Sequence, residues 1–145
     1  MFANQTIKIS SEAEMKNFAQ ECAKKCLHSH MITLNGTLGA GKTTFARDFI
    51  RTLTYEDIDV PSPTFTLVQE YETSKGILRH FDLYRLENNE EIYEIGWEDA
   101  IVNGINLIEW PDRLGALLPK KRTDILIEII SDNERVITVQ HHGID

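Results

Sequence analysis

The stretch "ITLNGTLGAGKTTFARDF", residues 32–49, joins an apolar run to an amphipathic one through three glycines that fall within six positions. The apolar run predicts a strand at 31–35, and the spacing of apolar residues predicts a helix at 43–53. Ordering a glycine costs more backbone entropy than ordering any other residue. Three glycines at a strand-to-helix junction therefore indicate that the backbone approaches a ligand closely.

Residues 36–43, GTLGAGKT, match the phosphate-binding loop pattern G-x-x-x-x-G-K-[ST] at every fixed position. Backbone N–H groups from about Gly39 to Thr44 are expected to surround a phosphate at the positive end of the following helix. Lys42 would neutralise β- and γ-phosphate oxygens, and the Thr43 hydroxyl would ligate Mg²⁺. A glycine-rich turn that only caps a helix is the alternative, but the strand before it and the helix after it favour a nucleoside triphosphate site.

Two carboxylates stand at the ends of predicted strands, Asp82 in RHFDLYR and Glu109 in NLIEW. Hydrolysis needs a carboxylate near the metal, and ligands of open α/β sheets bind at the carboxyl ends of strands. Glu109 follows the more continuous apolar run, which favours a strand beside the phosphate-loop strand and a direct or water-mediated hold on Mg²⁺. Asp82 would share the metal or orient the attacking water. For each, the alternative is an exposed acid at a strand end.

Thr64 and Trp110 are further site candidates. The segment PSPTF, residues 61–65, looks like a switch, because its prolines restrain a loop from which Thr64 would reach the γ-phosphate or Mg²⁺. An ordinary turn closed by a hydroxyl side chain explains the segment equally well. Trp110 is either a stacking platform near the site or a core residue, and its spacing favours the core.

Arg79 and Arg85 flank Asp82 and are candidates for an internal arginine that stabilises transition-state charge. Ion pairing with the acidic segment 87–99 is the favoured alternative for both.

The bulk properties predict one folded domain, residues 1–145, since 145 residues can bury well over half of the surface of an unfolded chain. The N-terminus lacks a basic segment followed by an apolar one, and no apolar run approaches about 18 residues. We therefore expect a cytoplasmic protein with no membrane association. The net charge of −8 argues against a chain that holds nucleic acid by itself.

Cys22 and Cys26 stand four positions apart on a predicted helix. A zinc site that includes His28 and His30 is one interpretation. The apolar stripe of the helix contains both cysteines, which favours two buried side chains that behave as small hydrophobic residues.

The predicted elements alternate in type along the chain. Two antiparallel hairpins are expected, from strands 66–72 with 77–86 and 123–130 with 135–142. The other predicted elements are strands at 6–10 and 105–110 and helices at 10–27, 87–104 and 112–119. Together they predict an α/β protein with a P-loop NTPase-like three-layer fold and a mixed, partly antiparallel central sheet.

With these residues in view, the chain resembles the bacterial TsaE family, the small P-loop ATPases of tRNA threonylcarbamoyladenosine biosynthesis. LGAGKTTFAR, SPTFTLVQEY, HFDLYRL, EIGWEDA and IEWPDR stand in the family's order over roughly residues 30–115. The first of these is generic to P-loop proteins, whereas the combination of the second, third and fifth is specific.

The resemblance implies roles for individual residues. It implies catalytic roles for Lys42, Asp82 and Thr64. It implies Mg²⁺ ligation by Thr43 and Glu109, with Asp82 in a Walker-B-like role, and nucleotide binding by Gly39, Ala40, Gly41, Lys42, Thr43, Thr44 and Trp110. Two further residues are predicted to contact the adenine, Ser11 and Arg135, with helix capping and surface charge as their alternatives. The family more usually carries an acid where this chain has Thr37.

The same resemblance implies a function. The chain would bind and hydrolyse ATP slowly alone and faster with TsaB and TsaD. TsaD would transfer the threonylcarbamoyl group to adenosine 37 of tRNAs that read codons beginning with A, so tRNA would be contacted only through the partners. Three alternatives are a metabolite kinase, for which an arginine-rich lid is missing, a GTPase, for which an N-K-x-D motif is missing, and a nucleotide-binding scaffold without turnover.

Overall fold

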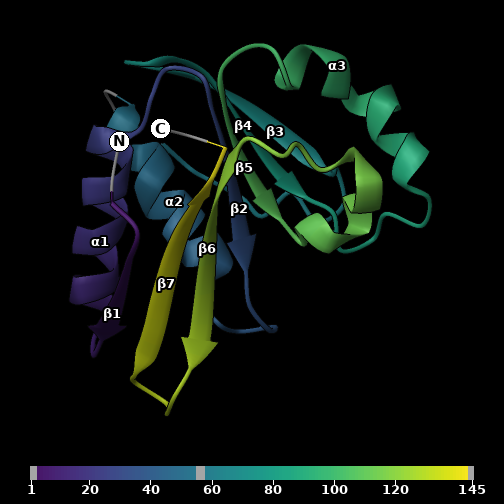
Figure 1. Ribbon diagram of the computed structural model, residues 1–145. Coiled ribbons are helices and arrows are strands. Elements are labelled where there is room, and N and C mark those ends of the chain that lie inside the picture. Colours follow the sequence, from purple (N-terminus) through teal and green to yellow (C-terminus); the bar gives the residue numbers. More distant parts are fainter. Residues whose placement is uncertain (1–2, 55–57, 144–145) are drawn as a thin grey trace.

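A mixed sheet of seven strands runs through the part of the chain that the computed structural model describes, residues 3–54 and 58–143 (Figure 1). The strands lie across the sheet in the order β1-β7-β6-β2-β5-β4-β3. In chain order they are β1 (Gln5–Ile9), β2 (His30–Asn35), β3 (Val68–Thr73), β4 (Gly76–Asp82), β5 (Ile105–Glu109), β6 (Arg122–Ile129) and β7 (Arg135–His142).

The central strands are parallel and the outer ones are antiparallel. β2 pairs in parallel with β5 and β6, and β4 pairs in parallel with β5. The pairs β3–β4, β6–β7 and β1–β7 are antiparallel. Both predicted hairpins and the predicted mixed α/β sheet are therefore confirmed, and the carboxyl ends of β2, β4 and β5 meet at one edge.

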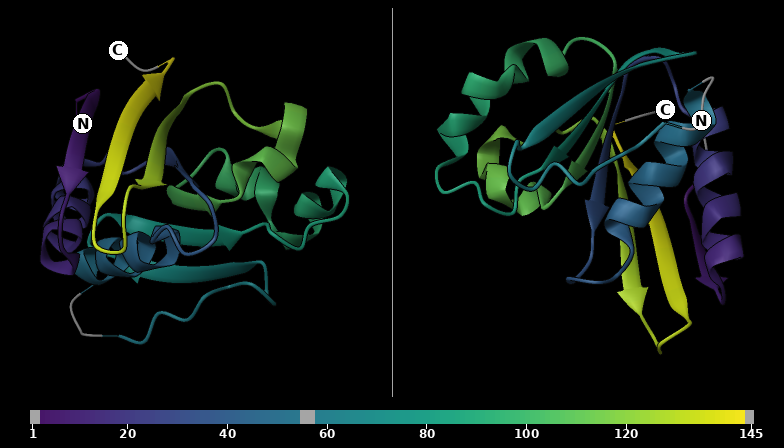
Figure 2. Two further views of the ribbon diagram at one scale, coloured as in Figure 1. Left: turned by 90° about the horizontal axis from the view of Figure 1, so that it is seen from below. Right: turned by 180° about the vertical axis from the view of Figure 1, so that it is seen from behind.

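Helices cover both faces of the sheet, which makes three layers (Figure 2). On one face α1 (Glu12–Lys25) and α2 (Lys42–Leu53) pack through aromatic rings, with the Phe18 and Phe45 centroids 5.8 Å apart. On the other face lie η1 (Asn89–Ile95), α3 (Trp97–Ala100) and η2 (Pro111–Leu117). No helix in the described ranges is long and apolar enough to cross a membrane.

The second helical layer differs from the predicted one. The expected helix at 87–104 is a 3₁₀ helix followed by the short α3, and Gly96 separates them with a φ of +91°. The expected helix at 112–119 is η2, which is kinked at Gly115. Apolar residues three positions apart suit a 3₁₀ helix as well as an α-helix, so their spacing in the sequence cannot distinguish the two types of helix.

The strand expected at 77–86 ends at Asp82. The Asp82 carboxylate accepts a hydrogen bond from the Tyr84 backbone N–H at 3.1 Å, which turns the chain out of the sheet. Leu83 and Leu86 make the sequence after Asp82 look like more strand, although both residues are buried in the core of the second layer. The turn therefore places Asp82 at the carboxyl end of β4, beside the carboxyl end of β5.

Cys22 and Cys26 are free, buried cysteines in the core between α1 and the sheet. Burial raises the pKa of the Cys22 thiol to about 12, which disfavours the thiolate that a zinc ion requires. The structure therefore supports two apolar core residues and does not support the zinc interpretation.

His30, the first residue of β2, makes stability depend on pH. Its Nε2 lies 2.8 Å from Thr123 Oγ1, which lies 2.6 Å from His141 Nδ1. Burial, and then the charge of His141, lowers the pKa of His30 from 6.5 to about 4. Between these pH values the unfolded chain binds the extra proton. The free energy of unfolding should therefore fall by up to about 3 kcal/mol as the pH drops through this window.

Urea unfolding at several pH values between neutrality and the acid side measures this dependence. The variant His30→Gln cannot titrate, so its free energy of unfolding should change less over the same range. A dependence that persists undiminished in the variant would contradict the assignment to His30.

Candidate nucleotide-binding site

The glycine loop connects the end of β2 to the start of α2. Gly39 and Gly41 have φ values of +78° and +113°, in the left-handed region that favours glycine. Gly41 is the N-cap of α2, and no side chain in the described part of the chain caps this end of the helix. The first amides of α2 therefore remain available to an anion, at the positive end of the helix dipole.

A cavity of about 440 Å³ opens beside this loop. It brings together nearly all the predicted site residues, from four separate segments of the chain. Its lining includes Gly39, Gly41, Lys42, Thr43, Thr44, Thr64, Asp82, Glu109 and Trp110. Ala40 is buried behind the loop, and Thr37 is exposed outside the lining.

Lys42 is a buried lysine whose ammonium faces this cavity. Its Nζ donates a hydrogen bond to the Gly36 carbonyl oxygen at 2.5 Å and lies 3.5 Å from the centre of the Trp110 ring. Burial lowers the pKa of Lys42, although the carboxylates of Glu109 and Asp82 oppose that shift. The side chain is therefore a poorly solvated cation held next to the glycine loop.

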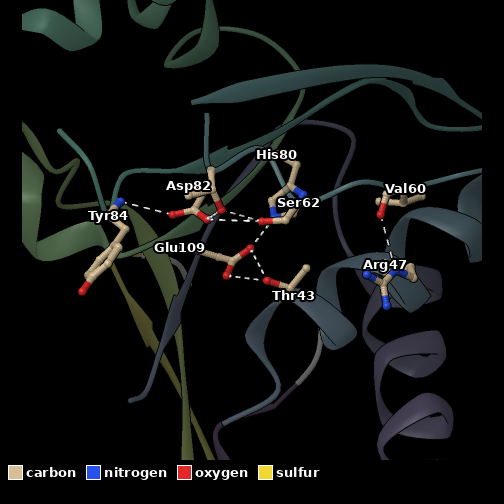
Figure 3. A network of polar contacts seen from close by, with 9 residues as sticks. Thr43, Arg47, Val60, Ser62, His80, Asp82, Tyr84 and Glu109 are labelled. Carbon is tan, nitrogen blue, oxygen red and sulfur yellow. Dashed lines mark hydrogen bonds and ion pairs between the residues drawn. The ribbon is translucent and has the colours of Figure 1, made fainter. Parts of the chain in front are cut away.

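Glu109 joins the phosphate loop to the neighbouring strand (Figure 3). It is buried at the end of β5, and its two carboxylate oxygens lie 3.0 and 3.2 Å from Thr43 Oγ1. The expected position of Glu109, on a buried strand beside the phosphate-loop strand, is confirmed.

Asp82 lies opposite Glu109 in the register of β4 and β5, and its carboxylate faces the segment 61–65. The Thr64 hydroxyl donates to Asp82 Oδ2 at 2.9 Å. The loop before this segment is tied to α2 by a hydrogen bond from Arg47 to the Val60 carbonyl oxygen. The structure thus connects the predicted switch threonine to the predicted Walker-B-like acid.

Trp110 is both a packing residue and a wall of the cavity. Its partly buried ring packs against the core of the second layer, 4.9 Å from the Tyr84 ring centre. Its backbone has a φ of +59°, a rare conformation for a residue other than glycine. This strained turn after Glu109 aims the indole at Lys42.

The two candidate arginines lie in different places. Arg79 is buried away from the cavity, where it donates to the Asn103 carbonyl oxygen and pairs with Glu70. Arg85 lines the cavity, with its guanidinium carbon 4.4 Å from the centre of the exposed Phe65 ring. Only Arg85 is therefore positioned beside the predicted site, and the partner of Arg79 lies outside the acidic segment 87–99.

Ser11 and Arg135 lie together on the other side of the loop. They line a second cavity of about 570 Å³ with Gly39 and Thr44. Ser11 also caps α1, because its hydroxyl accepts the Glu14 N–H, and Arg135 donates to the Ala40 carbonyl oxygen at 3.0 Å. Both residues thus combine a structural role with a place beside the glycine loop.

His80 is the residue at this edge that the sequence reasoning missed. Its ring is fully buried, and Nε2 lies 2.6 Å from Glu109 Oε2. His80 and Asp82 are two positions apart on one strand, so their side chains leave the same face of the sheet. The H-x-D spacing in HFDLYRL was the signal that could have identified it.

The oxygen atoms of Thr43, Glu109 and Asp82 suit Mg²⁺, which commonly takes one or two carboxylates together with substrate phosphates. Within the described residues, no group of three or more His, Cys, Asp or Glu side chains is arranged to hold a metal ion. The donor set therefore fits an ion that binds with a nucleotide better than one held by protein ligands alone.

Gly36 is the loop glycine with the least room for a side chain. A Cβ atom at Gly36 would lie 2.6 Å from the Ile127 backbone oxygen, whereas one at Gly39 would meet no atom of the described residues within 4 Å. Gly36→Ala should therefore lower the free energy of unfolding by about 2 kcal/mol more than Gly39→Ala. Chemical denaturation measures both losses, and equal losses would show that the contact with Ile127 is unimportant.

The glycine loop and the sheet around it place the chain in the P-loop NTPase fold class. The sequence pattern of the family described as "Threonylcarbamoyl adenosine biosynthesis protein TsaE" matches residues 9–137. The chain belongs to the TsaE family, a family of tRNA threonylcarbamoyladenosine biosynthesis, which confirms the predicted resemblance.

Individual relatives agree with this assignment. The protein named tRNA threonylcarbamoyladenosine biosynthesis protein TsaE from Rickettsia bellii is 40% identical over 139 residues, which cover 96% of each chain. The protein of the same name from Aquifex aeolicus is 40% identical and covers 90% of this chain and 92% of its own length. The crystal structure of Bacillus subtilis YdiB superposes with a TM-score of 0.75 at 31% identity, over 99% of this chain and 88% of YdiB.

Proposed function

We propose that this protein is a Mg²⁺-dependent ATPase of the cytoplasm, required with TsaB and TsaD for threonylcarbamoyladenosine formation at position 37 of tRNAs that read codons beginning with A. The observation that carries the proposal is the contact between Thr43 and Glu109, which joins the phosphate loop to a carboxylate on the adjacent strand. Such a pair is the arrangement by which P-loop NTPases hold nucleotide-bound Mg²⁺.

The residues divide the work of hydrolysis. The amides between Gly39 and Thr44 would bind phosphate oxygens, and the Lys42 ammonium would exchange the Gly36 carbonyl for them. Thr43 and Glu109 would hold Mg²⁺, which when bound neutralises charge on the phosphates. Asp82 would orient a water molecule for attack, and Thr64 would connect it to the nucleotide through the switch segment.

The cavity with Ser11 and Arg135 is the proposed place for the adenine. It adjoins the cavity beside Lys42 along the glycine loop, since Gly39, Gly41 and Thr44 line both. Arg135 is already fixed by the Ala40 carbonyl oxygen, so its guanidinium would form one wall of this cavity with little reorganisation.

Steady-state phosphate release, measured alone and with purified TsaB and TsaD, tests the proposal. The chain should release phosphate from ATP slowly by itself and faster with the two partners, and it should prefer ATP to GTP. Transfer of phosphate to a metabolite would favour a kinase instead. Partners that neither bind the chain nor raise its rate would contradict the proposed role.

A further inference from the structure

We propose that His80 is a positioning residue that holds Glu109 in the orientation needed for the metal, an inference that rests on the proposed function. The ring lies on β4, next to the strand that carries Glu109. Nε2 is 2.6 Å from Glu109 Oε2, and the exposed fraction of the His80 side chain is 0%. A carboxylate only accepts hydrogen bonds, so Nε2 carries the hydrogen and donates it.

The surroundings of His80 show that this bond is the ring's one polar contact among the described residues. The other ring nitrogen, Nδ1, is buried and has no hydrogen-bond partner there. His30 is a useful comparison, because it is also buried but uses both nitrogens, with the Leu27 N–H and with Thr123. A buried imidazole with a bare nitrogen is a poor choice for packing alone. Its directed bond to Glu109 is therefore the property that an apolar residue would not supply.

That bond fixes which way the Glu109 carboxylate faces. The terminal torsion of a glutamate is broad, so a carboxylate with one partner rotates easily. Thr43 Oγ1 lies 3.0 Å from Oε1 and 3.2 Å from Oε2, so it barely distinguishes the two oxygens of Glu109, whereas His80 contacts Oε2 at 2.6 Å and so fixes the rotation of the carboxylate. Residues that orient metal ligands in this way affect metal affinity by about 10- to 100-fold when they are replaced.

Two near-isosteric variants separate the hydrogen bond from the packing. In His80→Gln the amide N–H₂ reaches about as far as Nε2 and can still donate, whereas the thioether of His80→Met cannot. Both are compared with the unsubstituted protein for the dissociation constant of Mn²⁺, followed by electron paramagnetic resonance with a non-hydrolysable ATP analogue. The same variants are tested for analogue binding in EDTA and for thermal unfolding.

We expect His80→Met to raise the Mn²⁺ dissociation constant by about tenfold or more, and His80→Gln to raise it by a clearly smaller factor. Binding of the analogue in EDTA should not change in either variant. Equal losses of Mn²⁺ affinity in both, no loss in His80→Met, or an equal loss of metal-free binding would each overturn the positioning role.

A folding defect in the variant and a failure of the proposed function can each be told apart from a failure of the positioning role. Should His80→Met fail to fold, His80→Asn replaces it, because its shorter amide reaches only the Nδ1 position and should show the same loss. If the unsubstituted protein binds no Mn²⁺ with the analogue, the proposed function and the positioning role both fail. Normal Mn²⁺ binding that is insensitive to His80 overturns the positioning role alone.

Discussion

Lys42→Ala should reduce ATP hydrolysis by about 100-fold or more, because it removes the cation that faces the developing charge on the phosphates. In the free protein the ammonium donates to the Gly36 carbonyl oxygen and lies over the Trp110 ring. Burial lowers the pKa of Lys42, so these two contacts do not fully replace the water that the ammonium loses on folding. Phosphate oxygens would satisfy the same ammonium better, so we expect Lys42 to exchange the Gly36 carbonyl for them in the proposed nucleotide complex.

Lys75 offers a matched control for this variant. Its ammonium donates to the carbonyl oxygens of Ala23, Lys24 and Cys26 at the C-terminal end of α1. This end of α1 leads into the start of β2, whereas the glycine loop follows the end of β2. Lys75→Ala should therefore lower the melting temperature and leave hydrolysis nearly unchanged. Lys42→Ala should instead greatly slow hydrolysis, while the free energy of unfolding changes by at most about 1 kcal/mol. A Lys42→Ala variant that still hydrolyses ATP at the original rate would contradict the assigned role.

The sequence predicted the sheet well because its strands leave strong local signals. β2 and β5 are almost continuously buried and read as apolar runs, and both hairpins join strands that lie close together in the sequence. The second helical layer was predicted less well. Its elements are short and broken at Gly96 and Gly115, where contacts with the sheet, and not helix propensity, set the backbone.

The site residues that could be predicted from the sequence were those that lie in a recognised motif or at the end of a predicted strand. The loop pattern identified Lys42 and Thr43, and the end of an apolar run identified Glu109. The H-x-D spacing shows that His80 shares a face with Asp82, but its contact with Glu109 comes from a neighbouring strand, and pairing across strands is not visible in one stretch of sequence. For the same reason the sequence left Arg79 and Arg85 equivalent, although only Arg85 lines the cavity.

Glu109→Gln should lower ATP hydrolysis by about 100- to 1000-fold and raise the Mg²⁺ concentration needed for the half-maximal rate. The substitution keeps the size of the side chain but removes the charge that lies 3.0 Å from the Thr43 hydroxyl. Asp82→Asn should also slow hydrolysis but change the Mg²⁺ requirement much less, because Asp82 contacts Thr64 and the Tyr84 backbone instead of Thr43. Rates measured over a Mg²⁺ titration distinguish a metal ligand from a residue that orients water.

Thr43 provides the control for this comparison, because the proposed metal site needs its hydroxyl and not its methyl group. Thr43→Ser keeps an oxygen within reach of both Glu109 and the ion, so its Mg²⁺ requirement should stay near that of the unsubstituted protein. Thr43→Val has nearly the same shape but no oxygen, and it should resemble Glu109→Gln. If Asp82→Asn raised the Mg²⁺ requirement more than Glu109→Gln did, the roles of the two carboxylates would be reversed. The direct ligand would then lie on β4, and the contact between Thr43 and Glu109 would serve only to fix the loop against β5.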